Sequence, residues 1–520
     1  MKQGLVRERL DARPAPRLKP QPRSNRLTLL DAIADPKLFK PFFKHPASWV
    51  AWRAFIAAAF GLPMSSEELA IYRACTGRND APTQQMRELV LVIGRRGGKS
   101  RILALIAVWL ACFHDYRQFL DEGELGVVQV LAADKEQARV ILRYVKGFIK
   151  KVPMLARMIE RDTNVGLELS NSISIEITTS SYRAVRGRTV VAALCDEIAF
   201  WQSEDSSNPD AEVVNAIKPG MATIPTSMLL LASSPYARRG VLYNMHRQYH
   251  GKDDPRVLGW QAATDVMNPE IDPAFLAQAY EDDPVSAASE YGATFRQDVS
   301  DYVAREAVEA VTSDECERPY LPEFKYHAFA DAAGGSGSDS FTLAIGHVER
   351  GISVLDVIRE AKPPFSPKAI VEQYSALLKS YSISKLSGDR YAGDWPREQF
   401  LEHRITYEPS AKPKSAIYGE FLPMMMSKKC DLLDNTRLMN QLCGLERRTA
   451  RSGKDSIDHA PNGHDDVANA VAGVLTSMGV RKYRYVADLS WVGGPVDTNN
   501  HGQSRSAQML SNILTLRGIR

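Results

Sequence analysis

The fold of this chain is decided by the stretch Leu89-Val90-Leu91-Val92-Ile93-Gly94-Arg95-Arg96-Gly97-Gly98-Lys99-Ser100. Its five apolar residues, rich in β-branched side chains, predict a short buried strand, and residues 102–107 after the loop predict a helix. Glycines let the backbone N–H groups of such a loop turn inward, and the helix N-terminus adds positive potential. We therefore expect a phosphate cradle built by Gly94, Gly97 and Gly98, in which Lys99 reaches the β- and γ-phosphates of ATP and Ser100 binds Mg²⁺.

The spacing of this loop departs from the standard pattern. GxxxxGK[ST] requires a glycine at position 93, where this chain has Ile93. An ordinary tight loop between a strand and a helix is therefore the alternative, and the rest of the chain has to decide between the two.

Length and composition set the class of protein. A chain of 520 residues exceeds one hydrophobic core, so we expect two domains or more. Its apolar content of 44%, charged content of 24% and net charge of +3 are ordinary for a globular protein. The six cysteines form no C-x-x-C pair, which argues against a disulfide framework or a zinc site and fits a reducing compartment. The longest apolar run, 102–113, is too short for a membrane span, and we expect no signal peptide.

The N-terminal region predicts a basic flexible arm over residues 1–38. Residues 1–26 contain eight Lys or Arg, two acidic residues and four prolines, so they cannot build a core. The segment is either a solvated tail or an arm that touches DNA phosphates or a partner protein. From residue 39 to 60 aromatic residues cluster, and we expect most of them in a core and one against an adenine ring.

A second acidic motif supports an ATPase. Residues 125–132 predict a strand, residues 134–151 a helix that begins at Asp134, and residues 189–195 another strand that ends in Asp196-Glu197. Asp196 would hold Mg²⁺ through water, and Glu197 would orient and activate the attacking water. A plain turn is the alternative. Downstream of a Gly-Gly-Lys-Ser loop, however, the pair favours an ATPase domain over residues 39–240 with a parallel-type sheet.

A further strand, residues 228–232, ends in Ser233-Ser234-Pro235. Small hydroxyl residues at the carboxyl end of a strand face the crevice in which open α/β sheets bind ligands. Ser233 or Ser234 would sense the γ-phosphate, unless the triplet is simply a turn before the proline. Residues 241–320 are polar and irregular, and we expect a small helical lid or linker there rather than a sheet.

The second half of the chain predicts an RNase H-like domain over residues 321–480. Strands 326–330, 341–348 and 352–358 follow one another, and then helix, strand, helix, strand and helices alternate until a final helix begins at His464-Asp465-Asp466. Such a fold places one carboxylate on its first strand, one after its fourth strand and one on a late helix. Asp331, Asp389 and either Asp465 or Asp466 occupy these places.

Clustered carboxylates without a cysteine partner suit Mg²⁺ or Mn²⁺. Two such ions can activate water and stabilise the leaving oxygen when a phosphodiester is hydrolysed. Helical phase favours Asp466 over Asp465 as the third ligand. Asp466 borders the apolar stripe of Val467, Val471 and Val474, whereas Asp465 would point toward solvent.

An ATPase half followed by an RNase H-like half resembles the large terminase subunit of tailed double-stranded DNA bacteriophages, over about residues 40–480. These subunits often carry a shortened Walker A motif, G-R-x-x-G-K-S, as Gly94–Ser100 does. The resemblance implies that Arg95 is the cis-acting arginine, with Arg96 as the rival and as a further nucleotide-binding residue. It also makes Asp196-Glu197 the Walker B motif, Ser233-Ser234-Pro235 the coupling motif, and the acidic groups of the second half three nuclease motifs.

The resemblance implies a DNA-packaging motor. Such a subunit hydrolyses ATP to move double-stranded DNA through the portal protein into a procapsid, and it cuts concatemeric DNA with a metal-dependent endonuclease. A small terminase subunit, a homo-oligomeric ring expected to be a pentamer, and action in the host cell cytoplasm rather than in the mature virion belong to the same expectation. Residues 481–520 are expected to be a flexible tail. A host-type ATP-dependent DNA repair nuclease, or an ATP-gated assembly protein without nuclease activity, are the alternatives.

Overall fold

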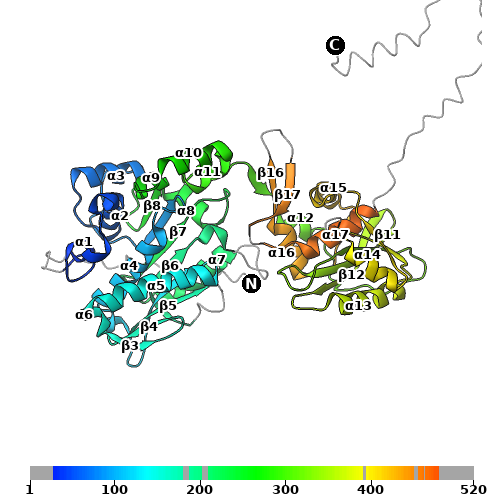
Figure 1. Ribbon diagram of the computed structural model, residues 1–520, viewed down its shortest axis with the longest axis horizontal. Coiled ribbons are helices and arrows are strands. Elements are labelled where there is room, and N and C mark those ends of the chain that lie inside the picture. The colour runs from blue at the N-terminus through cyan, green and yellow to red at the C-terminus, as the bar shows by residue number, and fades with distance from the viewer. Residues whose placement is uncertain are drawn as a thin grey trace, which may run out of the picture. The chain divides into compact units, whose positions relative to one another are not determined.

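The computed structural model describes residues 27–179, 187–201, 209–389, 394–449, 455–461 and 463–478. The expected basic arm up to residue 26 and the expected tail from residue 479 lie outside the described residues. None of the described helices is long and apolar enough to cross a lipid bilayer. Along the described chain, one α/β region is followed by a second (Figure 1).

Among the described residues, the first sheet has eight strands in the order β3–β4–β5–β2–β6–β7–β1–β8. Strands β5, β2, β6, β7, β1 and β8 run parallel, and β3 and β4 add an antiparallel edge. The parallel order brings the carboxyl ends of β1, β7 and β6 side by side. The strands are β1 Glu88–Ile93, β2 Gly126–Ala132, β3 Ile159–Asp162, β4 Gly166–Leu169, β5 Ile173–Thr179, β6 Thr189–Asp196, β7 Met228–Ser233 and β8 Val257–Ala262.

Strand β1 is apolar throughout because both of its faces are covered. Leu89, Leu91 and Ile93 lie in one core cluster, with helices α2, α4 and α5. Val90 and Val92 point to the opposite face and lie in a second cluster, with α7 and α8. A parallel strand buried on both faces reads as a continuous apolar run, as the sequence predicted here. The helices of this half are α1 Leu29–Ala34, α2 Val50–Phe60, α3 Ser66–Thr76, α4 Lys99–Phe113, α5 Lys135–Lys151, α6 Pro153–Ala156, α7 Pro209–Ile217 and α8 Gly240–Tyr249.

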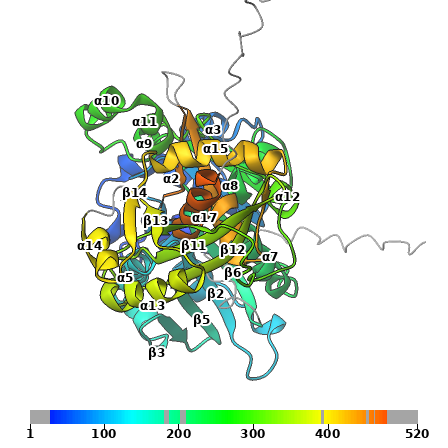
Figure 2. The ribbon, with the colours of Figure 1, turned by 90° about the vertical axis from the view of Figure 1, so that its right-hand side faces the viewer.

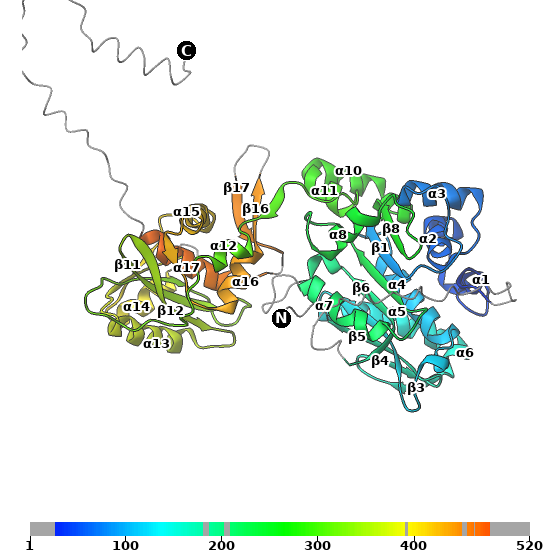
Figure 3. The same ribbon diagram turned by 180° about the vertical axis from the view of Figure 1, so that it is seen from behind.

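Two expectations about the borders of this half are wrong. The segment 241–320 was expected to contain no sheet, but its residues Val257–Ala262 form β8, which pairs with β1 and is covered by α3 (Figure 3). The sequence pattern of this strand is hard to recognise because the strand is short and lies among polar loops. Trp260 is its one large buried side chain. Helical structure is also present before residue 39. Thr28 caps helix α1, and Leu29 joins the core.

Most of the other elements in the segment 241–320 are short helices, and one short strand, β9 Val299–Asp301, lies near its end. Asp272 and Asp283 each accept a hydrogen bond from a backbone N–H at the start of a helix, and each is followed by a proline at the first helical position. The helices are α9 Thr264–Met267, α10 Pro273–Asp282, α11 Pro284–Glu290 and α12 Arg305–Glu309.

The second half contains a sheet in the order β14–β13–β10–β11–β12–β15. Strands β10, β11 and β12 form an antiparallel meander, β13 pairs parallel with β10, and β14 pairs parallel with β13. This is the strand order expected of an RNase H-like domain. The strands are β10 His327–Asp331, β11 Phe341–Glu349, β12 Ile352–Ala361, β13 Lys385–Gly388, β14 Thr406–Pro409 and β15 Cys430–Asp431.

Helices cover both faces of this sheet (Figure 2). The final helix packs on the face that carries Phe329, Ala344 and Leu355. Val371 and Phe400, from two other helices, pack on the opposite face. The helices are α13 Pro367–Ser380, α14 Trp395–Glu402, α15 Lys414–Met426, α16 Thr436–Gly444 and α17 Asp466–Ser477.

Two further details differ from the sequence prediction. Helix α16 ends at Gly444, and Leu445–Thr449 form β16, which pairs with β17 Asp455–His459 and with β9 Val299–Asp301. The sequence predicted only helices between the fifth strand and the final helix. The core of the RNase H-like half also reaches residues before the expected boundary at 321, because Tyr302, Val308 and Val311 lie in the same core as α17. Both differences have the same cause. Contacts between segments that are distant in sequence cannot be predicted from the local sequence pattern.

The close approach of α17 to β10 yields a test of the packing. A Cβ added at Gly473 would lie 2.6 Å from ring atoms of Phe329. We expect Gly473→Ala to lower the free energy of unfolding by about 1–3 kcal/mol, because the ring or the helix must move. Gly419→Ala on α15 is the matched control, since a Cβ there meets no atom within 4 Å. Urea unfolding of both variants measures the difference, and equal stabilities would contradict this account of the packing.

Candidate functional site

The first candidate site lies at the carboxyl ends of β1, β6 and β7. A cavity of about 620 Å³ opens there. Its lining brings together Arg95, Arg96, Gly97, Gly98, Lys99, Ser100 and Glu197 from the predicted set, with Trp49, Trp52 and Gln137 among the others. The predicted phosphate loop and the predicted second acid therefore face one space, although about a hundred residues separate them in sequence.

The glycines of the loop are required by close approach and by backbone conformation. A Cβ on Gly94 would lie 2.2 Å from the hydroxyl oxygen of Thr264. Gly98, immediately before α4, has a φ of +94°, which residues with a side chain rarely tolerate. The first glycine of the loop is thus needed because it packs closely against the start of helix α9.

Side chains from outside the loop hold its backbone in place. The indole N–H of Trp52 donates to the Gly97 carbonyl at 2.9 Å, and the amide of Asn268 donates to the Arg96 carbonyl at 3.0 Å. Trp52 is itself buried. The aromatic cluster of residues 39–60 is therefore mainly core, as expected, and Trp49 is the aromatic residue that lines the cavity beside Trp52.

Lys99 is almost fully buried at the base of the cavity. Its ammonium lies 3.2 Å from Glu197 Oε1 and donates to the Ile93 carbonyl at 3.1 Å. The lysine is thus held by the strand that precedes the loop and by the acid that follows β6. A cation so placed attracts phosphate oxygens.

Ser100 and Asp196 lie together, as the sequence predicted for a magnesium site. The Ser100 hydroxyl donates to Asp196 Oδ2 at 2.9 Å. Asp196 Oδ1 is buried and has no hydrogen-bond partner among the described residues. Burial and the neighbouring Glu197 raise the pKa of Asp196 to about 6. A buried carboxylate with one unused oxygen, next to a hydroxyl, fits the ligand set of a hard divalent ion.

Gln137 is a site residue that the sequence prediction missed. Its side-chain amide donates to Asp196 Oδ2 at 2.7 Å and to Ser100 Oγ at 2.9 Å. Asp134 caps α5 by accepting from the Gln137 backbone at 2.8 Å, which places this glutamine in the first turn of the helix. The available signal was its position just after β2, whose carboxyl end lies beside that of β6.

Glu197 is held by both serines of the predicted coupling motif. Glu197 Oε2 accepts from Ser233 Oγ at 3.0 Å, from the Ser234 backbone at 3.1 Å and from Ser234 Oγ at 3.3 Å. Its φ of +51° turns the residue sharply away from the strand. The structure thus links β6 to β7 through the carboxylate that would orient water.

The two arginines of the loop are placed differently. Arg95 pairs with Glu290 of α11 at 3.2 Å and lines two cavities, the one above and a second of about 460 Å³ that also contains Glu197 and Ser234. Arg96 lines only the first. The position of Arg95 between the two cavities that share Glu197 favours it over Arg96 for the role of the charge-stabilising arginine.

The second candidate site is an acidic cavity of about 410 Å³ in the RNase H-like half. It is lined by Asp331 at the end of β10, Asp389 after β13, and both Asp465 and Asp466 at the start of α17. Burial raises the pKa of Asp331 well above its usual range, and the neighbouring acids Asp466, Asp389 and Asp465 raise it further. Carboxylates crowded in this way are stabilised by divalent cations, and the oxygen-only donor set suits Mg²⁺ or Mn²⁺.

The prediction that Asp465 points toward solvent is wrong. Asp465 is 5% exposed, and its carboxylate accepts from Tyr418 at 2.8 Å and pairs with Lys414 at 3.1 Å. The helical phase fails because Asp465 is the N-cap residue, with a φ of −139°, and the helix begins only at Asp466. Asp466 is 8% exposed and accepts from the Ser340 backbone at 3.1 Å; burial raises its pKa to about 6.

Lys414 and Asn469 are further residues of this cavity that the sequence prediction did not name. Lys414 lies between Asp458, at 2.7 Å, and Asp465, so this group of acids already holds a cation. Although burial opposes its charge, Asp465 and Asp458 raise the pKa of Lys414. Asn469 lies one turn beyond Asp466 on α17 and could have been found from this spacing.

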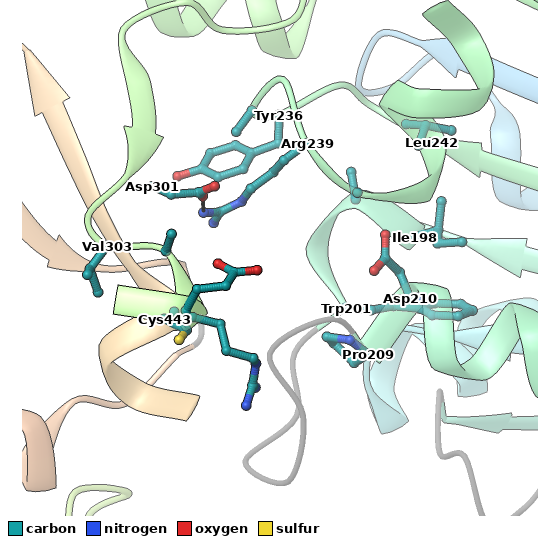
Figure 4. Close-up of a pocket in the computed structure, with 17 residues that line it drawn as sticks. Ile198, Trp201, Pro209, Asp210, Tyr236, Arg239, Leu242, Asp301, Val303 and Cys443 are labelled. Carbon is teal, nitrogen blue, oxygen red and sulfur yellow. Dashed lines mark hydrogen bonds and ion pairs between the residues drawn. The ribbon is translucent and has the colours of Figure 1, made fainter. Parts of the chain in front are cut away.

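A third cavity of about 360 Å³ contains none of the predicted site residues (Figure 4). Two of its charged side chains, Asp210 and Arg239, have partners. Asp210 accepts from the Val241 backbone at 2.6 Å, and Arg239 pairs with Asp301 and Glu446. Because these groups are already paired, the cavity offers no obvious chemistry.

Comparison with known proteins identifies a family model for the first half of the chain. A model described as "Uncharacterized protein MJ0330, N-terminal P-loop domain" matches residues 64–293. None of the curated proteins matches this chain.

Three solved structures illustrate the likeness. The large terminase of bacteriophage HK97 is 13% identical, with 76% of this chain and 91% of that chain covered and a TM-score of 0.34. The large terminase of a thermophilic bacteriophage, in complex with ATP-gamma-S, is 11% identical, with 75% and 93% covered and a TM-score of 0.33. The large terminase nuclease of the thermophilic phage G20c is 17% identical, with 34% and 97% covered and a TM-score of 0.30. These three structures are large terminases or part of one. The first half of this chain matches a model of a P-loop domain, and its second half has the strand order of an RNase H-like domain.

Proposed function

We propose that this chain is the catalytic subunit of a viral DNA-packaging motor, which hydrolyses ATP to move double-stranded DNA and cuts DNA with a metal-dependent endonuclease. One observation carries the proposal: a phosphate loop with a paired Lys99 and Glu197, and a separate cavity with Asp331 and Asp389, occur on one chain. A motor that both moves and cuts DNA needs these two chemistries together.

In the ATPase half, the residues of the loop bind and orient the nucleotide. Lys99 attracts the β- and γ-phosphates, and Glu197, fixed by Ser233 and Ser234, orients the attacking water and takes its proton. Mg²⁺ would be held by Ser100 and Asp196, and it would neutralise charge on the phosphates. Arg95 stabilises charge that develops on the γ-phosphate, after release from Glu290.

In the nuclease half, Asp331, Asp389 and Asp466 are the proposed metal ligands. Asp466 is preferred because the carboxylate of Asp465 is taken by Lys414 and Tyr418. A pair of Mg²⁺ or Mn²⁺ ions would activate water and steady the leaving oxygen of a phosphodiester. Asp465 then acts as a positioning residue that orients the start of α17.

The remaining parts of the proposal concern partners. Double-stranded DNA is the substrate, a small terminase subunit selects it, and the portal protein of the procapsid receives a homo-oligomeric ring, proposed to be a pentamer. The site of action is the host cell cytoplasm. A host-type repair nuclease or an ATP-gated assembly protein without nuclease activity are the alternatives, and the full set of acids in the second cavity argues against the latter.

The role of Glu197 is tested by Glu197→Gln. The variant keeps the size and hydrogen-bonding capacity of the side chain but loses the base, so nucleotide binding should persist while turnover falls by roughly 100-fold or more. Phosphate release and binding of a fluorescent ATP analogue measure the two quantities. Glu168→Gln on β4 of the same sheet is the matched control and should change neither. Normal turnover of Glu197→Gln would remove Glu197 from the mechanism.

The two chemistries should be separable in the full chain. Asp389→Asn is expected to abolish Mn²⁺-dependent plasmid cleavage and to leave ATP hydrolysis intact, because the two cavities share no lining residue. Lys99→Ala should do the reverse. Both assays are run on the same preparations. If either variant loses both activities while remaining folded, the sites are coupled and the proposed division is wrong.

The choice between the adjacent acids of α17 is tested by Asp465→Asn and Asp466→Asn. Asp466→Asn should lose cleavage without losing thermal stability, because its pKa is raised in the fold and the charged form is therefore unfavourable at neutral pH. Asp465→Asn should melt at a lower temperature, because it weakens the pairing with Lys414, yet should still cut. The opposite pattern of cleavage would make Asp465 the ligand.

A further inference from the structure

Asn469 is a buried amide inside the acidic cavity. It is 1% exposed and lies on α17, three residues after Asp466 and on the same face. It lines the cavity together with Asp331 and Asp389. Asparagine is an unfavourable choice for a helix interior that is otherwise built from Val, Ala, Gly and Leu, so its side chain needs a reason.

The amide nitrogen of Asn469 lies between the two central carboxylates. Nδ2 donates to Asp331 Oδ2 at 2.8 Å and to Asp389 Oδ2 at 3.2 Å. These two acids come from β10 and from the end of β13, which are parallel neighbours in the sheet. The end of the amide that faces the cavity is therefore within 3.2 Å of an oxygen of each carboxylate, close enough for all three groups to bind one ion.

The amide oxygen of Asn469, unlike its nitrogen, has no hydrogen-bond partner among the described residues. This Oδ1 atom is also buried. Buried polar atoms without partners are rare and call for an explanation. A half-turn of the amide plane about χ2 exchanges the two ends at little steric cost, because the oxygen and the nitrogen are nearly the same size. After such a turn, the oxygen faces Asp331 and Asp389.

We propose that Asn469 is a ligand of the divalent cation held by Asp331 and Asp389, and that its amide presents Oδ1 to that ion. An oxygen facing two carboxylates is repelled unless a cation lies between them, so ion binding and the turn of the amide occur together. Amide oxygens are ordinary ligands of hard divalent cations. A neutral ligand also adds no further negative charge to a cavity already lined by several aspartates.

This inference rests on the proposed nuclease function and refines its metal site. A different role is available for the same contacts: Asn469 could serve only as a donor that holds the two carboxylates in position. The substitutions Asn469→Asp and Asn469→Leu separate the two roles. In Asn469→Asp, the side chain keeps an oxygen that can bind the ion but loses the N–H donor. In Asn469→Leu, the side chain has a similar volume but loses both the oxygen and the donor.

The test measures Mn²⁺ binding by the full-length protein without nucleotide. Electron paramagnetic resonance of the free Mn²⁺ gives the amount that is bound. Every protein, including the parent, carries Asp196→Asn so that the ATPase site does not contribute. Relative to this parent, we expect Asn469→Leu to weaken Mn²⁺ binding by roughly 10-fold or more, and Asn469→Asp to bind at least as tightly. Asn171→Leu is the matched control. Asn171 also has a buried Oδ1 without a described partner, but it lies in the ATPase half and should leave binding unchanged.

Melting curves with and without Mn²⁺ provide a second readout. The rise in melting temperature on adding Mn²⁺ should be smaller for Asn469→Ala than for the parent, which keeps the test valid if the leucine variant folds poorly. Parent-like binding by both Asn469→Leu and Asn469→Ala overturns the inference. A loss in Asn469→Asp as large as in Asn469→Leu shows the donor role instead and also overturns it. Failure of the parent itself to bind Mn²⁺ would count against the proposed nuclease, not against Asn469 alone.

Discussion

Parallel pairing between strands that are distant in sequence is the constraint on which both sites depend. In the first sheet, β7 pairs with β1 on one side and with β6 on the other, so the phosphate loop, the serine pair and Asp196-Glu197 emerge at one edge. In the second sheet, Ala330 of β10 is paired with Gly388 of β13, and the next residues, Asp331 and Asp389, are brought together. Sheet register thus sets the distances between the side chains of each candidate site, because the carboxyl ends of parallel strands meet at the same edge.

Crowding of acids is the second physical theme of the molecule. Asp196 in the first site and Asp331 in the second are both buried next to other carboxylates, and burial raises the pKa of each. In both sites a neutral amide lies between the oxygens: Gln137 between Ser100 and Asp196, and Asn469 between Asp331 and Asp389. An amide donor reduces repulsion without introducing a permanent positive charge, which would compete with a divalent ion for the carboxylates.

The phosphate loop is held by residues of the segment 241–320, which the sequence predicted to be a lid or linker. Thr264 and Asn268 donate to carbonyl groups of the phosphate loop, and Glu290 pairs with Arg95. Strand β8 joins this region to the sheet beside β1. The phosphate loop therefore has contacts to this segment through these two side-chain hydrogen bonds and this ion pair.

The sequence by itself determined the type of each sheet, the phosphate loop, the acidic residues at the strand ends and the resemblance to large terminases, because these features are carried by local runs of apolar residues and by the residues next to them. It predicted neither β8 nor β16, since a strand among polar loops is identified only by its partner. It misplaced Asp465, because helical phase does not extend to an N-cap residue, and it missed Gln137 and Asn469, whose roles come from contacts across the fold. Tertiary structure decided these points because the distance between side chains from separate elements depends on packing, which local sequence does not encode.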